Sequence, residues 1–231
     1  MKFNDTTNKT GIIQDIEGLL GFADGTISGD STLLKIFTRM INHWYRTANQ
    51  WIWQVTGTWE YDDSNYTNFP FATTDLADGR KDYTIPSTAQ KILRVEVEDD
   101  EGNWHELSQL DLSMINGAVD EYFSENGLPI YYDITGRSLL LYPAPSSSDV
   151  TISNGLKLYF TRDIDEFSST DTDKEPGFEK AFHRILSVGP ALDYSMANGM
   201  RDKVSYLSDM LAILRSDMEK FYGEEMILKS S

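Results

Sequence analysis

The chain has 231 residues, no cysteine and a formal net charge of −17, from 37 acidic and 20 basic residues. Hydrophobic residues make up 40% of it, which is enough for the core of one generous domain or two small ones. The absence of cysteine excludes disulfides, zinc–thiolate sites and cysteine nucleophiles, and it agrees with a reducing compartment. The acidic balance argues against a nucleic-acid reader, because such proteins neutralise phosphates with Lys and Arg.

The sequence predicts neither a signal peptide nor a membrane span. Residues 1–7 contain no apolar stretch of signal-peptide length, and no run of about 18 apolar residues occurs. We therefore expect a soluble, cytosolic chain without a membrane span. The acidity has two interpretations: a solubility device, or a wall along a DNA passage that repels the phosphate backbone.

Two helices are predicted in the first quarter of the chain. An apolar stripe predicts a short helix over 12–20 that ends near Gly21, and Asp30 or Ser31 can cap a second, longer helix over 33–55. The apolar face of the second helix recurs at steps of three and four residues and is rich in aromatic side chains, and we interpret it as core packing. The opposite face carries the polar residues Lys35, Arg39, Arg46 and Gln50.

The middle of the chain has β character. Residues 57–71 predict an extended polar loop with a strand at one end. A short strand is predicted at 83–86, stopped by a proline, and the alternation over 91–97 predicts a half-buried strand before an acidic turn at 99–102. Residues 106–123 predict a weak helix.

The clearest hairpin lies at 127–142. Val, Ile, Leu and Tyr favour strands on both sides of the turn 135–138, and Gly136 supplies the positive φ that a tight turn needs. Pro143 stops the second strand. With a further strand at 155–162, we expect about five β elements.

The C-terminal part is predicted to be helical. Residues 166–175 are polar and acidic, which is typical of a mobile linker. Two apolar stripes, over 178–196 and 204–221, then predict two antiparallel helices separated by Asn198-Gly199. Residues 223–231 form a tail that either frays or docks on a neighbour.

No catalytic, cofactor-binding or metal-binding residues are predicted. Residues 171–175 begin like a calcium loop, but Pro176 and Phe182 occupy the positions that need glycine and a bidentate carboxylate. The histidines His43, His105 and His183 lack the spacing of a metal or catalytic site. Nucleophile-elbow, phosphate-loop and dinucleotide-binding motifs are also missing.

Two alternatives remain open at this point. An acidic, glycosidase-like hydrolase needs only two carboxylates at a set separation, which Glu96 with Glu98 or Asp163 with Asp165 could supply. A carbohydrate-binding module would stack sugars on aromatic residues, for which the candidates are Trp53, Trp59, Tyr61, Tyr66, Tyr131 and Tyr132.

Two motifs and their order resemble a known family. Residues 83–86 read Tyr-Thr-Ile-Pro and are followed by the strand Lys-Ile-Leu-Arg-Val at 91–95, and residues 127–132 read Gly-Leu-Pro-Ile-Tyr-Tyr. Together with the long aromatic helix before them and the helix pair after them, they resemble the head-to-tail adaptor (connector, or head completion) proteins of tailed bacteriophages. The resemblance extends from about Ile12 to Tyr222.

The resemblance implies an α+β fold in which a helical bundle, formed by the long N-terminal helix and the C-terminal helical hairpin, contains an inserted small antiparallel β layer. The expected parts are residues 1–56 and 166–222 for the bundle, 57–165 for the β-rich insertion and 223–231 for the tail. Family members end the long helix in aromatic residues that meet the β layer, and Trp44, Trp51 and Trp53 are placed for that role.

The resemblance also implies a function without catalysis. The expected protein is a structural virion component: a ring homo-oligomer, expected to be a dodecamer, that joins the capsid portal to the tail and lets DNA pass non-specifically through its lumen. Its partners would be copies of itself, the portal protein and the next tail or connector protein, with no membrane and no cofactor. It would reside at the head–tail interface of the virion, and in the host cytoplasm during assembly. The residues predicted to contact other subunits or the portal are Trp53, Trp59, Tyr61, Tyr131, Tyr132, Met226, Ile227 and Leu228.

Overall fold

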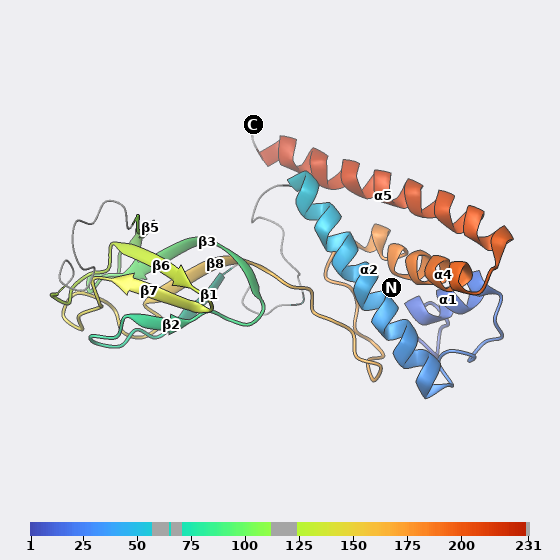
Figure 1. The fold of residues 1–231 in the computed structure, drawn as a ribbon, viewed down its shortest axis with the longest axis horizontal. Helices are drawn as coiled ribbons and strands as arrows, with labels where there is room; N and C mark the ends of the chain where they lie inside the picture. The colour runs from blue at the N-terminus through green and yellow to red at the C-terminus, as the bar shows by residue number, and fades with distance from the viewer. Residues whose placement is uncertain (57–64, 66–70, 112–123, 230–231) are drawn as a thin grey trace. The chain divides into compact units, whose positions relative to one another are not determined.

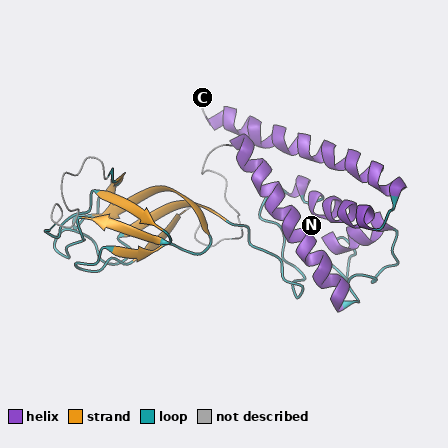
Figure 2. Ribbon diagram, viewed as in Figure 1, coloured by secondary structure: helices purple, strands orange, loops and turns teal. Residues whose placement is uncertain are grey.

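The computed structural model describes residues 1–56, 65, 71–111 and 124–229, without the side chains of 225–229. Within these ranges the chain has four α-helices, one short 3-10 helix and eight strands in two sheets (Figure 2). The predicted α+β class is therefore confirmed. The chain forms two compact units: a helical unit of residues Met1–Thr67 and Ile164–Ser231, and a β unit of residues Asn68–Asp163 (Figure 1).

The helical unit begins with the two helices that the sequence predicts. Helix α1 spans Ile12–Leu20 and ends at Gly21, whose φ of 69° lies in the left-handed region that glycine adopts without strain. Helix α2 spans Ser31–Thr56. Asp30 caps it, because its Oδ1 accepts hydrogen bonds from the backbone N–H groups of Thr32 (2.8 Å) and Leu33 (3.1 Å).

The C-terminal helices differ in their bounds from the prediction. A 3-10 turn, η2 (Lys180–Phe182), precedes α4 (Ile185–Ala197), and α5 runs from Arg201 to Lys229. Residues 223–229 therefore continue α5, where the sequence predicted a separate tail. Helix α4 packs against α1, α2 and α5, and it supplies much of the buried apolar surface of this unit. Among the described residues, no helix is long and apolar enough to cross a membrane.

The prediction that residues 166–175 form a mobile linker is wrong. Residues 165–175, called the strap below, are fastened to the helical unit by Phe167, which is only 3% exposed and stacks on Phe3 at 4.9 Å between ring centroids. The amide of Asn42 donates to the carbonyl of Phe167 and accepts from its N–H, both at 2.9 Å. The N–H of Phe3 also donates to the carbonyl of Lys174 (2.8 Å). The strap has a low average hydrophobicity, but one buried aromatic residue, Phe167, is enough to hold it on the helical unit.

The β unit contains two four-stranded sheets, where the sequence predicted one layer of about five strands. The first sheet has the order β1 (Phe71–Thr74), β8 (Leu156–Arg162), β3 (Ala89–Glu98), β4 (Trp104–Glu106). The second has the order β2 (Asp82–Thr84), β7 (Ser138–Tyr142), β6 (Tyr131–Thr135), β5 (Ser108–Gln109). All neighbours are antiparallel except β5 and β6, which are parallel.

The helix predicted over 106–123 is wrong at its start. Residues 104–106 and 108–109 are strands, and Leu107 between them is buried while its N–H donates to the carbonyl of Val95 (2.9 Å). Pairing with neighbouring strands thus overrides a weak helical pattern. The rest of the predicted helix, residues 112–123, lies outside the described residues.

The predicted hairpin is present. Strands β6 and β7 pair from Tyr131 with Tyr142 to Thr135 with Ser138, which leaves a two-residue turn whose Gly136 has a φ of 62°. Alternate residues of β7, Leu139 and Leu141, point into the core between the sheets. This core fixes the register of the hairpin, because a slip by one residue would turn these leucines outward.

Candidate interaction site

The residues predicted to make subunit contacts belong to both units of the structure. Trp53 lies on α2 and is half-buried, and its indole nitrogen has no hydrogen-bond partner among the described residues although it is enclosed. Tyr131 and Tyr132 lie on β6. Trp59 and Tyr61 fall outside the described residues. Met226, Ile227 and Leu228 lie in the last turns of α5, where only the backbone is described.

Two of the tryptophans that were expected to meet the β layer, Trp44 and Trp51, pack on helices of their own unit. Trp44 packs on α4, where its indole N–H donates to Oδ2 of Asp193 (2.7 Å) and its ring covers Gly189. Trp51 meets Trp44 edge to face at 6.1 Å, and the guanidinium of Arg215 from α5 lies 4.7 Å from the Trp51 ring centroid. These two residues therefore join the long helix to the other helices of its own unit.

The two tyrosines of β6 have different surroundings. Successive residues of a strand point to opposite faces, so Tyr131 and Tyr132 cannot share one surface. Tyr132 packs against the β core, and burial, followed by the charge of Glu106, raises the pKa of its phenol. Tyr131 is half-buried on the other face. A contact role for either residue remains a prediction.

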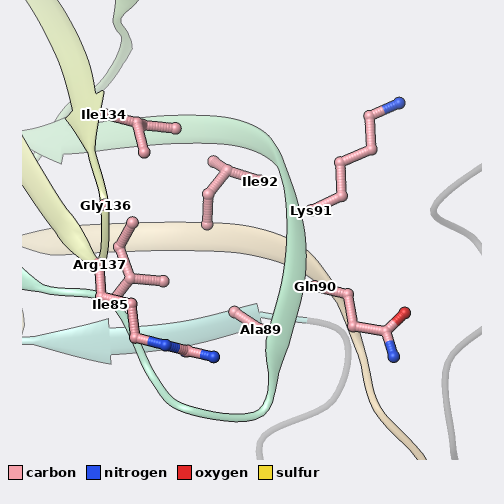
Figure 3. A pocket seen from close by; sticks show the side chains of 8 residues that line it. All are labelled: Ile85, Ala89, Gln90, Lys91, Ile92, Ile134, Gly136 and Arg137. Carbon is pink, nitrogen blue, oxygen red and sulfur yellow. The ribbon is translucent and has the colours of Figure 1, made fainter.

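A hollow at the end of the β unit was missed by the sequence analysis (Figure 3). It measures about 310 Å³ and is lined by Ile85, Ala89, Gln90, Lys91, Ile92, Ile134, Gly136 and Arg137. Irregularities in the pairing of β3 with β8 lie between Ala89 and Lys91 and between Ile92 and Arg94. Such bulges bend a strand. In Figure 3 the curved part of β3 arches over the hollow, Ile92 and Ile134 point into it, and Lys91 points away.

The chemistry of this hollow is that of a contact site. Arg137 reaches across its rim and donates from Nη1 to the carbonyl of Pro86 (3.1 Å), beside the apolar side chains of Ile85, Ile92 and Ile134. The hollow can therefore accept an apolar side chain that has an anionic group beside it, next to Arg137. Its described lining contains no carboxylate, histidine or serine, and the one amine on it, that of Lys91, points away from the hollow (Figure 3).

One carboxylate of each pair suggested for hydrolysis is engaged in an ion pair. Glu96 is buried and receives Nε of Arg94 at 2.5 Å and Nζ of Lys157 at 3.5 Å, so it crosslinks neighbouring strands. Asp165, in the strap, pairs with Lys174 at 2.9 Å. These contacts give both carboxylates structural partners, and they provide no support for a glycosidase pair.

The three histidines lie in separate surroundings. His183 is fully buried, with Nε2 2.8 Å from the carbonyl oxygen of Phe178 and Nδ1 2.6 Å from the Met1 amino group, and burial lowers its pKa to about 4. His105 lies 2.7 Å from Asp99, and this contact, with backbone N–H donors, lowers the pKa of Asp99 to about 2. His43 is exposed on α2. No cluster of three or more potential metal ligands occurs in the described part of the chain.

A protein-family model matches most of the chain. The family model described as SU10 adaptor protein matches residues 10–219, which include all of the β unit and most of the helical unit. Both motifs that suggested phage adaptors, at 83–95 and 127–132, fall within the match. No curated protein matches the chain.

Proposed function

Because the chain belongs to the SU10 adaptor protein family, which consists of structural phage adaptors, we propose that it forms the ring joining the capsid portal to the tail. Family membership identifies a structural component of the virion. The ring, its expected dodecameric state and its place beneath the portal are the proposal. In it, α2 and the pair α4–α5 form the bundle that carries the inserted β unit.

The observation that supports this proposal most strongly is the extent of the family match. It covers both units of the chain, so the resemblance is not limited to one common supersecondary motif. A closed ring then gives a physical reason for a strong joint, since many modest interfaces act together and none is left open. Such a joint holds against internal DNA pressure without covalent links.

The proposed partners follow from this position. Copies of the chain contact one another around the ring, one face of the ring meets the portal protein, and the other meets the next tail or connector protein. DNA passes through the lumen without specific recognition. The net charge of −17 suits this role, because an acidic wall repels the phosphate backbone.

Electron cryomicroscopy of the phage tests the proposal directly. We expect density for a ring of this chain between portal and tail, at the vertex where the tail attaches. This density should be missing from particles assembled without the chain. Particles without the chain should contain packaged heads that leak DNA and carry no tail. Finding the chain elsewhere in the particle, or complete tailed particles without it, would refute the proposed role.

A further inference from the structure

Helix α2 has an unusual charge composition for this chain. Acidic residues number 37 of 231 in the sequence, yet none occurs among the 26 residues of α2. The helix carries Lys35, Arg39 and Arg46 instead. A long helix without a carboxylate is a local reversal of the charge of the whole protein.

The cations of α2 gather on one exposed face. At 100° per residue, a single stripe contains Lys35, Ile36, Arg39, His43 and Arg46, which we call the basic face of α2. All five side chains are exposed, and Ile36 is an apolar residue with 36% of its surface in solvent. The basic face therefore combines positive charge with an apolar patch.

Most of this charge has no ion-pair partner among the residues that the structure describes. Lys35 and Arg39 have no ion-pair partner among the described residues, whereas Arg46 pairs with Glu166 of the strap. Glu166 is the only acidic residue lining a hollow of about 350 Å³ beside Lys35, Arg39 and Arg46. The basic face thus has an excess of positive charge next to a depression that another surface can fill.

Helix α5 presents a surface of opposite charge. One stripe of its exposed side contains Asp202, Tyr206, Asp209, Ile213 and Asp217, which we call the acidic face of α5. Tyr206 is 59% exposed and Ile213 is 62% exposed. Lys220 continues this stripe toward the C-terminus. Tyr206 and Ile213 lie about two helical turns apart on this stripe, so another surface can cover both side chains together with the carboxylate between them.

We propose that the basic face of α2 in one copy docks on the acidic face of α5 in the next copy around the ring. The inference rests on the proposed function and adds the identity of one subunit interface. Arg39 and Lys35 would meet Asp209 and Asp202, and Ile36 would pack beside Tyr206 or Ile213.

The two faces have opposite charges and similar lengths. At 1.5 Å per residue, the basic face extends over roughly 16 Å and the acidic face over roughly 22 Å. Both lie on helices packed into one helical unit, and α2 and α5 contact each other through other residues, including Trp51 and Arg215. One copy therefore cannot bring its own two faces together. Different patches that join head to tail generate a ring when the rotation closes.

A second copy fits the basic face better than DNA does. Phosphates would leave Ile36 without an apolar partner, and Glu166 lies among the cations. The net charge of −17 also opposes approach of a polyanion, while it makes acidic surfaces abundant on every neighbouring copy. DNA binding to this face is the competing outcome of the test below.

Reversing two charges at a time in the full-length chain tests the interface. The first variant, Lys35→Glu with Arg39→Glu, has two acidic faces, and the second, Asp202→Lys with Asp209→Lys, has two basic faces. Each variant alone should raise the concentration needed for assembly by about tenfold or more, because like charges then oppose each other. An equimolar mixture should assemble again with the two variants alternating. Reversing Lys9 and Lys180, two exposed lysines outside both faces, is the matched control and should leave assembly unchanged.

Disulfide capture gives a second measurement, since the chain has no cysteine. A mixture of the Arg39→Cys and Asp209→Cys variants should form a mixed disulfide dimer on mild oxidation, and neither variant should dimerise efficiently alone. The exposed residue Thr6, changed to Cys, provides the control for random collision.

The possible outcomes distinguish an error in the proposed interface from an error in the proposed ring. If the wild type forms rings alone or on the portal, but reversal has no effect and the mixed disulfide is missing, the interface is refuted while the proposed function stands. If the wild type forms no ring in either condition, the proposed function fails and the interface with it. If Arg39 reversal abolishes DNA binding while assembly is intact, the basic face serves DNA, and the inference is wrong.

Discussion

Replacing Gly189 by alanine should destabilise the protein, although alanine is the better helix former. Gly189 lies in α4 beneath the indole of Trp44, and an added Cβ would lie 2.2 Å from Cδ2 of that ring. The ring cannot move aside freely, because its N–H is bonded to Asp193. Overpacking costs about 1–3 kcal/mol, and loss of a hydrogen bond to a charged group costs about 1.5–3 kcal/mol.

The gain in helix propensity from glycine to alanine offsets only about 1 kcal/mol. We therefore expect Gly189→Ala to lower the free energy of unfolding by roughly 1.5–5 kcal/mol. Urea denaturation followed by the helical circular dichroism signal measures this change. Gly18→Ala in α1 is the matched control: nothing lies within 4 Å of its added Cβ, so this variant should be neutral or stabilised by up to about 1 kcal/mol.

A double-mutant cycle isolates the contact. On a Trp44→Ala background the clash is gone, so adding Gly189→Ala should cost little or should stabilise the protein. If Gly189→Ala is as stable as the wild type, or destabilises the Trp44→Ala background equally, the close approach of α2 and α4 at this glycine is not what the structure indicates.

Three further results are expected. Phe167→Ala should lower the free energy of unfolding by about 3–5 kcal/mol by removing the anchor of the strap, whereas Thr172→Ala, at an exposed strap position, should change it little in the same denaturation assay; equal effects would contradict a docked strap. Stability should fall as the pH drops from 6.5 toward 4, because His183 has a folded-state pKa of about 4 and the unfolded chain takes up the proton first; His183→Gln should flatten the thermal-melting profile in that window, and an unchanged slope would exclude His183 as its source. Tyr45→Phe should cost about 1–3 kcal/mol, since it removes the buried phenol oxygen that accepts a hydrogen bond from the N–H of Gly177 at 2.5 Å, and a neutral calorimetric result would argue against that bond.

Local signals in the sequence predicted much of the fold. Helix α2 is identified by its long apolar stripe and by the cap at Asp30, and the hairpin at 131–142 by the glycine its turn requires. These features depend on neighbours in sequence, so a short window contains the information that specifies them.

The missed features depend on distant contacts. Residues 104–109 form strands through pairing with β3 and β6, and the strap is ordered by Asn42, which lies 125 residues before Phe167. The hollow of the β unit likewise arises where the bent strand β3 passes the hairpin turn. None of these contacts leaves a periodic signal within its own segment.

The aromatic residues singled out in the sequence show the same division. Aromatic side chains mark interfaces and cores alike, and Trp44 and Trp51, which were expected to meet the β layer, pack on helices of their own unit. The proposed interface rests instead on charge and exposure, since the acid-free helix α2 and the solvent-exposed Ile213 are recognised only when composition and exposure are combined.

The mass of the assembled protein in solution is the most direct test of its role. Sedimentation velocity of the purified full chain should show a closed oligomer of defined mass, either alone or after addition of the portal protein of the same phage. A chain that sediments as a monomer in both conditions would contradict its assignment as a ring-forming adaptor.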